Sequence, residues 1–189
     1  MKDPDYSYVE QILNDLSTIG NHDFDYGLEK LDENISLANF PFLGGNIVNF
    51  QTRQAWDKTS PSTVVTLGNH KIGIVGMIGK GLTTSITSSV VKDLDFVAPY
   101  ALALNEARRL KEEGCLLVFL SIHESAAGAA AGLKQYPEAQ RYINGVFCGH
   151  SHQTESILQA GIPYLQASCN GAAYSHYGFC TVHYTFVLH

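Results

Sequence analysis

Basic residues are scarce in this sequence. Its 189 residues include 12 Lys and Arg against 18 Asp and Glu, which gives a formal net charge of −6 at pH 7. No run of Lys and Arg is longer than Arg108-Arg109. A nucleic-acid-binding surface needs clustered positive charge, so the composition argues against a nucleic-acid polymer as a partner. A phosphate group would have to be bound by metal and local amides instead of a broad basic surface.

Cysteine pairs and long apolar runs are missing too. The four cysteines show no CxxC spacing and lie in apolar or strand-like surroundings, so we expect small buried side chains and no disulfide framework: Cys115, Cys148, Cys169 and Cys180. No apolar run reaches the roughly 18 residues that a membrane span needs. The first residues, Met1-Lys2-Asp3-Pro4-Asp5, do not form a signal peptide. These features leave the compartment open.

The composition fits one globular domain. Apolar residues make up 45% of the chain and charged residues 16%, and 189 residues can bury one substantial core. We expect a single domain over residues 1–189. Strand-like and helix-like segments alternate along it, which predicts a layered α/β fold with mixed β-sheet flanked by helices.

Apolar periodicity predicts the order of the elements. Helical spacing indicates helices at residues 9–16, 28–35, 96–113 and 138–143. Apolar runs indicate strands at residues 17–19, 42–49, 115–120 and 146–148, and a hairpin of residues 64–67 and 72–75. Residues 157–188 are predicted to be mostly β. The Ala- and Gly-rich residues 126–131 fit either a loop or the start of a helix.

Three short segments rich in metal-binding side chains each follow an apolar strand. They are Gly20-Asn21-His22-Asp23-Phe24-Asp25, His123, and Gly149-His150-Ser151-His152. Open α/β sheets place their sites at strand ends, so we expect one metal centre there. The amide oxygen of Asn21 and the imidazoles of His123, His150 and His152 are the candidate ligands. The spacing of His150 and His152 suits two adjacent ions, one histidine for each.

His22 has a different predicted role. It directly follows a candidate ligand, so it can face the site without binding metal. A protonated His22 could donate to a leaving-group oxygen, and Asp25 could hold its far nitrogen. Together they form a candidate general acid.

Each segment also has a structural interpretation. GNHD could be a turn with an Asx cap, His123 a hydrogen-bonded structural histidine, and GHSH a polar turn. The second GNH, Gly68-Asn69-His70, lies between two β runs and is assigned to a hairpin turn. Glu124 and Ser125 are assigned to a solvated loop. The three segments together, each after a strand, favour the metal site.

The three segments resemble those of the calcineurin-like metallophosphoesterases, and most closely the 5′-nucleotidase and 2′,3′-cyclic-nucleotide 2′-phosphodiesterase family. The resemblance implies a hydrolase of nucleotide phosphoesters that uses hydroxide held between two divalent metal ions. Asn21, His123 and His150 would bind the second ion, His152 the first, and His22 with Asp25 would assist the leaving group. Zn, Mn, Mg and Fe are not distinguished. The partner would be a nucleotide or another small phosphoester, and the location periplasmic or extracellular.

The sequence also departs from this family. The Asp-x-His strand end and the Gly-Asp loop, which normally precede GNHD and supply a bridging carboxylate, have no match before Asn21. The expected fold is therefore an N-terminally truncated, partial metallophosphoesterase-like domain, which alone should bind at most one ion tightly and hydrolyse little. A non-catalytic metal-binding or structural remnant of the fold is the alternative, and an unrelated α/β binding protein a third.

Overall fold

The computed structural model describes residues 16–167 of the chain. Their main element is a six-stranded mixed sheet of order β4-β5-β7-β8-β10-β9. The inner strands are mutually parallel: β5 (His70–Ile78), β7 (Leu117–His123), β8 (Gly145–Cys148) and β10 (Ile162–Gln166). The edge strands β4 (Ser62–Leu67) and β9 (Glu155–Gln159) run antiparallel to their neighbours. The predicted α/β architecture with a mixed sheet is confirmed.

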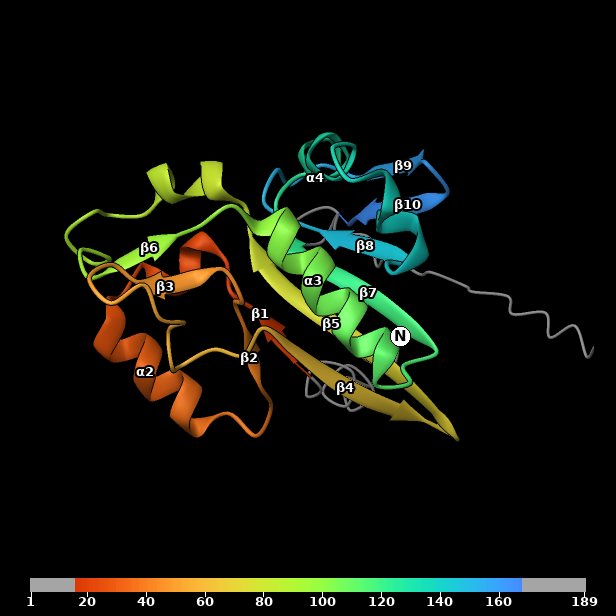
Figure 1. Cartoon of the computed structure of the whole chain (residues 1–189). Coiled ribbons are helices and arrows are strands. Elements are labelled where there is room, and N and C mark those ends of the chain that lie inside the picture. Colours follow the sequence, from red (N-terminus) through yellow and green to blue (C-terminus); the bar gives the residue numbers. More distant parts are fainter. Residues whose placement is uncertain (1–15, 168–189) are drawn as a thin grey trace, which may run out of the picture.

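Two helices cover one face of this sheet (Figure 1). They are α3 (Pro99–Glu112) and α4 (Ala126–Leu133), and a 3-10 helix η3 (Pro137–Arg141) precedes β8. Alternate residues of the inner strands, such as Val75, Val118 and Leu120, point to these helices and form the larger core. Gly73 lets α3 approach closely, because a β-carbon there would lie 2.9 Å from Leu110 Cδ1.

The N-terminal elements form a second, smaller core. These are β1 (Ser17–Thr18), η1 (Asn21–Phe24), α2 (Leu28–Leu37), β2 (Phe42–Leu43), β3 (Ile47–Asn49), η2 (Lys80–Ser85) and β6 (Leu94–Phe96). β1 pairs with β2 in parallel, and β3 pairs with β6 antiparallel. Phe24 is at the centre of this core, 1% exposed and edge-on to the ring of Phe96.

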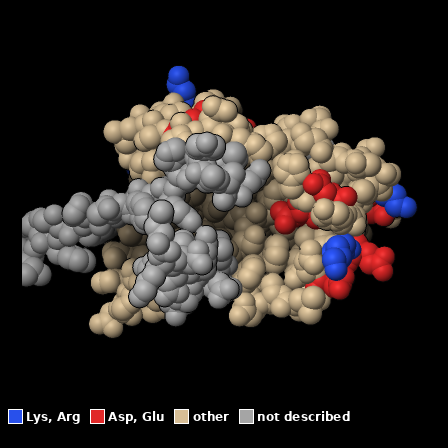
Figure 2. All heavy atoms as spheres, turned by 180° about the vertical axis from the view of Figure 1, so that it is seen from behind, with Lys and Arg blue, Asp and Glu red and all other residues tan. Residues whose placement is uncertain are grey.

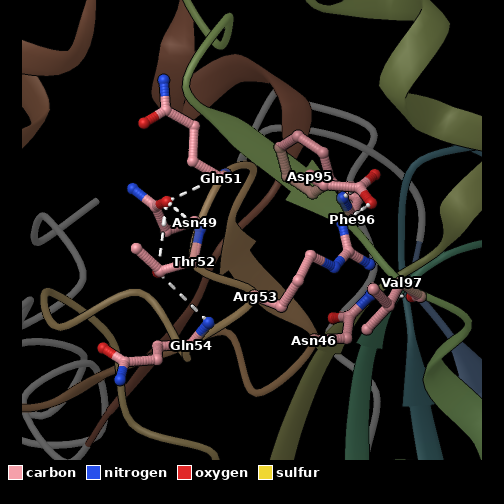
Figure 3. Close-up of polar contacts among 9 residues, drawn as sticks. All are labelled: Asn46, Asn49, Gln51, Thr52, Arg53, Gln54, Asp95, Phe96 and Val97. Atoms are coloured by element: carbon pink, nitrogen blue, oxygen red, sulfur yellow. Dashed lines mark hydrogen bonds and ion pairs between the residues drawn. The ribbon is translucent and has the colours of Figure 1, made fainter.

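Polar side chains join the smaller core to the sheet (Figure 3). The buried Asn46 carboxamide donates to the carbonyls of Ile78 and Val97 and accepts from the Ile78 N–H. Arg53 pairs with Asp95 of β6 at 2.6 Å. The end of β5 is therefore held in a fixed position relative to β3 and β6.

Several sequence predictions of elements need correction. Residues 42–49 are not one strand: Gly45 donates to the Gly76 carbonyl and Asn46 turns inward, which separates β2 from β3. Phe96 belongs to β6, and α3 starts only at Pro99 because proline suits the first helical position. Residues 138–143 are not an α-helix but largely the 3-10 helix η3.

Other predictions are confirmed or settled. The strand after residue 16, the helix that begins at Leu28, and the hairpin of β4 and β5 are present. Residues 126–131 are helical, as part of α4, because the Ser125 hydroxyl caps the Gly128 N–H. Cys115 and Cys148 are free thiols, and burial raises the pKa of Cys148 to about 12.

Some predictions lie outside the described residues. These are most of the helix at residues 9–16, the strands after residue 167, and Cys169 and Cys180. Within residues 16–167, no helix is long and apolar enough to cross a bilayer.

Candidate metal centre

The three candidate segments meet at the carboxyl ends of neighbouring strands. His123 is the last residue of β7, and Gly149 follows β8 directly. β1 leads into Gly20 and η1, and it lies against β7, where the Thr18 and Ser121 hydroxyls are 2.8 Å apart. β7 and β8 are adjacent parallel strands that end at the same edge of the six-stranded sheet. The contact of β1 with β7 brings the Gly20–Asn21 segment, about 100 residues away in sequence, to the same place.

Asn21, His123 and His150 converge on one point. The Oδ1 atom of Asn21 lies 2.8 Å from His123 Nε2 and 3.2 Å from His150 Nδ1. The centroids of the two imidazole rings are 5.2 Å apart. Asn21 is 4% exposed, so its oxygen faces the two histidines and not solvent.

These spacings fit donors to a shared metal ion. Two donors bound to one ion at about 2.0–2.2 Å lie roughly 2.8–3.6 Å apart. Both contacts are hydrogen bonds to Asn21 Oδ1, and their N···O distances are also in this range. Amide oxygen and imidazole nitrogen are suitable ligands for borderline divalent ions. Within residues 16–167, no three His, Cys, Asp or Glu side chains gather as a ligand set, so the third donor of this group is an amide.

The half-buried imidazole of His123 is held neutral. Burial, with a smaller contribution from the nearby His150, His22 and His152, lowers the pKa of His123 to about 4. An imidazole must be neutral to bind a metal ion. His123 is therefore in the ligand-competent form at neutral pH.

Gly20 is required by a close contact. A β-carbon at this position would lie 2.8 Å from both Cε1 and Nδ1 of His123. The backbone of Gly20 is extended, with φ −116° and ψ 179°, so any residue could adopt it. The space occupied by the His123 ring is what demands glycine.

Asp23 has a role within the η1 turn. Its Oδ2 accepts the Gly20 N–H at 2.7 Å, and burial raises the pKa of its carboxyl group. The carboxylate thus holds the Gly20–Asn21 backbone.

His22 and Asp25 form a pair beside the three donors. His22 Nδ1 lies 2.8 Å from Asp25 Oδ2, and the side chains are 70% and 49% exposed. The two residues are therefore joined as predicted, next to the buried Asn21.

His152 is placed differently from the three converging residues. It is exposed, has a backbone φ of 57°, and is close enough to His123 to influence its pKa. A cavity of about 200 Å³ opens beside His123, lined by residues of β1, β7 and β8 and by Gly149.

The second GNH lies elsewhere. Leu67 of β4 pairs with His70 of β5, so Gly68 and Asn69 are the two-residue turn of a hairpin, with φ 60° at Gly68. The assignment of this tripeptide to a hairpin is confirmed. His176, His183 and His189 lie outside the described residues.

Two residues near the site have roles that the sequence did not indicate. Glu124 is not in a solvated loop: it is half-buried and accepts the Tyr100 hydroxyl at 2.5 Å, while its carbonyl accepts the Gly149 N–H. Gln166, at the end of β10, is 3% exposed and bonds to residues that follow His150. No local pattern distinguishes Gln166 from other glutamines, so only the fold could reveal it.

Comparison with known proteins shows what this chain is similar to. The chain is 30% identical over 138 residues to an apyrase of Tabanus yao, an alignment that covers 73% of this chain and 24% of the apyrase. It is 29% identical over 138 residues to the NAD 5′-nucleotidase of Haemophilus influenzae, with 71% of this chain and 22% of that protein covered. The calcineurin-like phosphoesterase YfkN of Bacillus subtilis superposes with a TM-score of 0.68 at 21% identity, over 86% of this chain and 56% of that one. No family model matches.

The chain is a relative of the 5′-nucleotidases with the calcineurin-like phosphoesterase fold. It spans about a quarter of the length of the curated relatives that it matches. In this 5′-nucleotidase relative, two of the three segments follow adjacent strands of the six-stranded sheet, and the third follows β1, which pairs with β2.

Proposed function

We propose that this 5′-nucleotidase relative contributes a divalent metal site to the hydrolysis of nucleotide phosphoesters. The observation that carries the proposal is the convergence of the Asn21 amide oxygen with His123 and His150 nitrogens at 2.8 and 3.2 Å. The names of its relatives support nucleotides as the substrate class.

Asn21, His123 and His150 would hold the ion, and His152 would serve the first ion of a two-metal centre. A bound divalent ion would polarise the phosphoryl oxygens and offset their negative charge. Basic side chains, which could also offset that charge, are outnumbered in the sequence, with 12 Lys and Arg against 18 Asp and Glu. On the face shown in Figure 2, the described residues present no continuous patch of Lys and Arg, and Asp and Glu gather to one side.

His22 would act on the leaving group. Its ring is exposed and next to Asn21, so it can reach a substrate bound at the metal donors. Asp25 orients the ring through Nδ1, which leaves Nε2 to donate a proton to the departing oxygen. Both residues would therefore be catalytic without binding the ion.

A second candidate function is metal binding without turnover. The three converging donors are all neutral, and within the described residues no carboxylate joins them as a ligand set. Neutral donors alone should hold a hard divalent ion weakly. Under this alternative the chain binds metal, but the chemistry is absent.

Hydrolysis assays with the 189-residue chain separate the two functions. An aryl phosphate and a nucleoside monophosphate would be tested with Mn²⁺ or Zn²⁺ present and after chelation. We expect metal binding with little or no turnover from the chain alone, because its donors suffice for one weak site. Metal-dependent hydrolysis that is lost in His22→Ala would favour the full catalytic role, and metal-independent hydrolysis would exclude it.

A further inference from the structure

We propose that Gln166 positions the histidine loop, residues 149–153, so that His150 points toward Asn21 and His123. The inference rests on the proposed metal centre, because it concerns how one of its donors is placed. Gln166 would be a positioning residue that acts through the loop and does not touch the ion.

The histidine loop has a strained backbone. His150 and His152 have φ angles of 74° and 57°, in the left-handed region that residues with a β-carbon disfavour. Such a conformation is energetically unfavourable and persists only where the surroundings hold it. Two of the four non-glycine residues with positive φ in the described part of the chain are in this loop.

One carboxamide holds the middle of the loop. Nε2 of Gln166 donates to the Ser151 hydroxyl at 2.6 Å and to the Gln153 carbonyl at 2.8 Å. Both amide hydrogens are therefore used on residues that flank His152 and follow His150. The start of the loop is fixed separately, because the Gly149 N–H donates to the Glu124 carbonyl at 2.9 Å.

The unpaired oxygen of Gln166 indicates that this buried glutamine serves to bond the histidine loop. Three polar side chains are fully buried among the described residues: Asn21, Asn46 and Gln166. Asn46 satisfies both ends of its amide, whereas Gln166 Oε1 has no hydrogen-bond partner among residues 16–167. A buried unpaired acceptor destabilises the fold, and an apolar side chain would avoid that cost. The bonds to the histidine loop are what glutamine adds at this position.

Gln159 provides a matched control. Its Nε2 also donates to a backbone carbonyl, that of Ala130 in α4, at 2.6 Å from a half-buried position on the neighbouring strand β9. This bond ties a helix to the sheet and does not involve the histidine loop. Loss of either glutamine removes a similar tether, but of the two only Gln166 bonds to the histidine loop.

The test compares Gln166→Met and Gln159→Met with the unchanged 189-residue chain. Zn²⁺ affinity is measured by calorimetric titration, and Co²⁺ coordination by its visible absorption bands. We expect Gln166→Met to weaken Zn²⁺ binding about 10- to 100-fold, the usual effect of losing a residue that orients a ligand, and to change the Co²⁺ bands. Gln159→Met should stay within about twofold of the unchanged chain with the same bands.

Equal losses in both variants, or unchanged affinity in Gln166→Met, would overturn the proposal. If the unchanged chain binds no Zn²⁺, the metal centre itself fails. The positioning role is then judged from the His150 ring resonances of the metal-free chain, which should shift in Gln166→Met and not in Gln159→Met.

A further variant covers the case in which Gln166→Met does not fold. Ser151→Ala removes one acceptor and keeps the bond to the Gln153 carbonyl, so we expect a smaller but measurable loss of Zn²⁺ affinity. Unchanged affinity in Ser151→Ala would then contradict the proposal.

Discussion

Asn21 and His22 are consecutive residues in very different environments. The Asn21 side chain is buried with its oxygen between two histidines, whereas the His22 ring is 70% exposed and bonded to Asp25. We therefore expect His22→Ala to leave Zn²⁺ affinity nearly unchanged and His123→Ala to abolish detectable binding, both measured by titration. In any preparation with measurable turnover, His22→Ala should lower kcat by roughly 10²–10⁴. Loss of metal from His22→Ala would instead make His22 a ligand.

His123 should also affect how stability depends on pH. Its pKa is about 4 in the folded chain against an ordinary value of 6.5, so between these values the unfolded chain takes up a proton that the folded chain does not. Its contribution is full above pH 6.5 and is lost as the pH falls toward 4. After allowance for partial exposure of the ring, we expect a loss of about 1–2 kcal/mol.

The measurement is chemical denaturation of the chelator-treated chain at several pH values between 7 and 4.5. His123→Gln removes the titrating group, so the difference in unfolding free energy between the two chains isolates His123. A constant difference across this range would show that burial does not depress the pKa of His123.

The sequence could name most site residues but not their arrangement. GNHD, His123 and GHSH are recognisable because each ends an apolar strand with metal-binding side chains. That the Asn21 oxygen lies between the two imidazoles depends on the pairing of β7 with β8 and on the contact of β1 with β7. The contact of β1 with β7 joins residues more than 100 apart in sequence, and no local pattern specifies it.

At the scale of elements, the turn from β1 into η1 has little room. A β-carbon at Gly20 would contact the His123 ring at 2.8 Å, so Gly20→Ala must displace either the ring or the turn. We expect a destabilisation of about 1–3 kcal/mol, typical of overpacking, and weaker Zn²⁺ binding. Gly81→Ala is the control, because nothing lies within 4 Å of its added β-carbon and φ is not in the left-handed region. Similar losses in the two variants, measured by thermal unfolding and titration, would argue against this packing.

Apolar periodicity predicts helices and strands well where one face of the element is buried. It predicts them poorly where the backbones of two segments lie in close contact. α2 and the β4–β5 hairpin follow directly from their patterns. The break between β2 and β3 does not, because it depends on the Gly45 N–H reaching the Gly76 carbonyl and on Asn46 reaching Ile78 and Val97. α4 was ambiguous because alanine and glycine carry no periodic signal, and its cap at Ser125 decides it.

At the scale of the whole molecule, charge and donor chemistry together limit the function. The chain has a net charge of −6, and the face shown in Figure 2 has no basic patch among its described residues. Under the proposed function, a phosphoester substrate would depend on metal for its binding, and hydrolysis would require the metal site.

The most direct test is the stoichiometry of metal binding to the 189-residue chain. Titration with Zn²⁺ should show one weak site per chain, lost in Asn21→Ala, His123→Ala and His150→Ala and kept in His70→Ala, whose residue starts β5 after the hairpin turn. Equal losses from His70→Ala and His150→Ala, or binding that survives all three ligand substitutions, would contradict a metal centre at Asn21, His123 and His150.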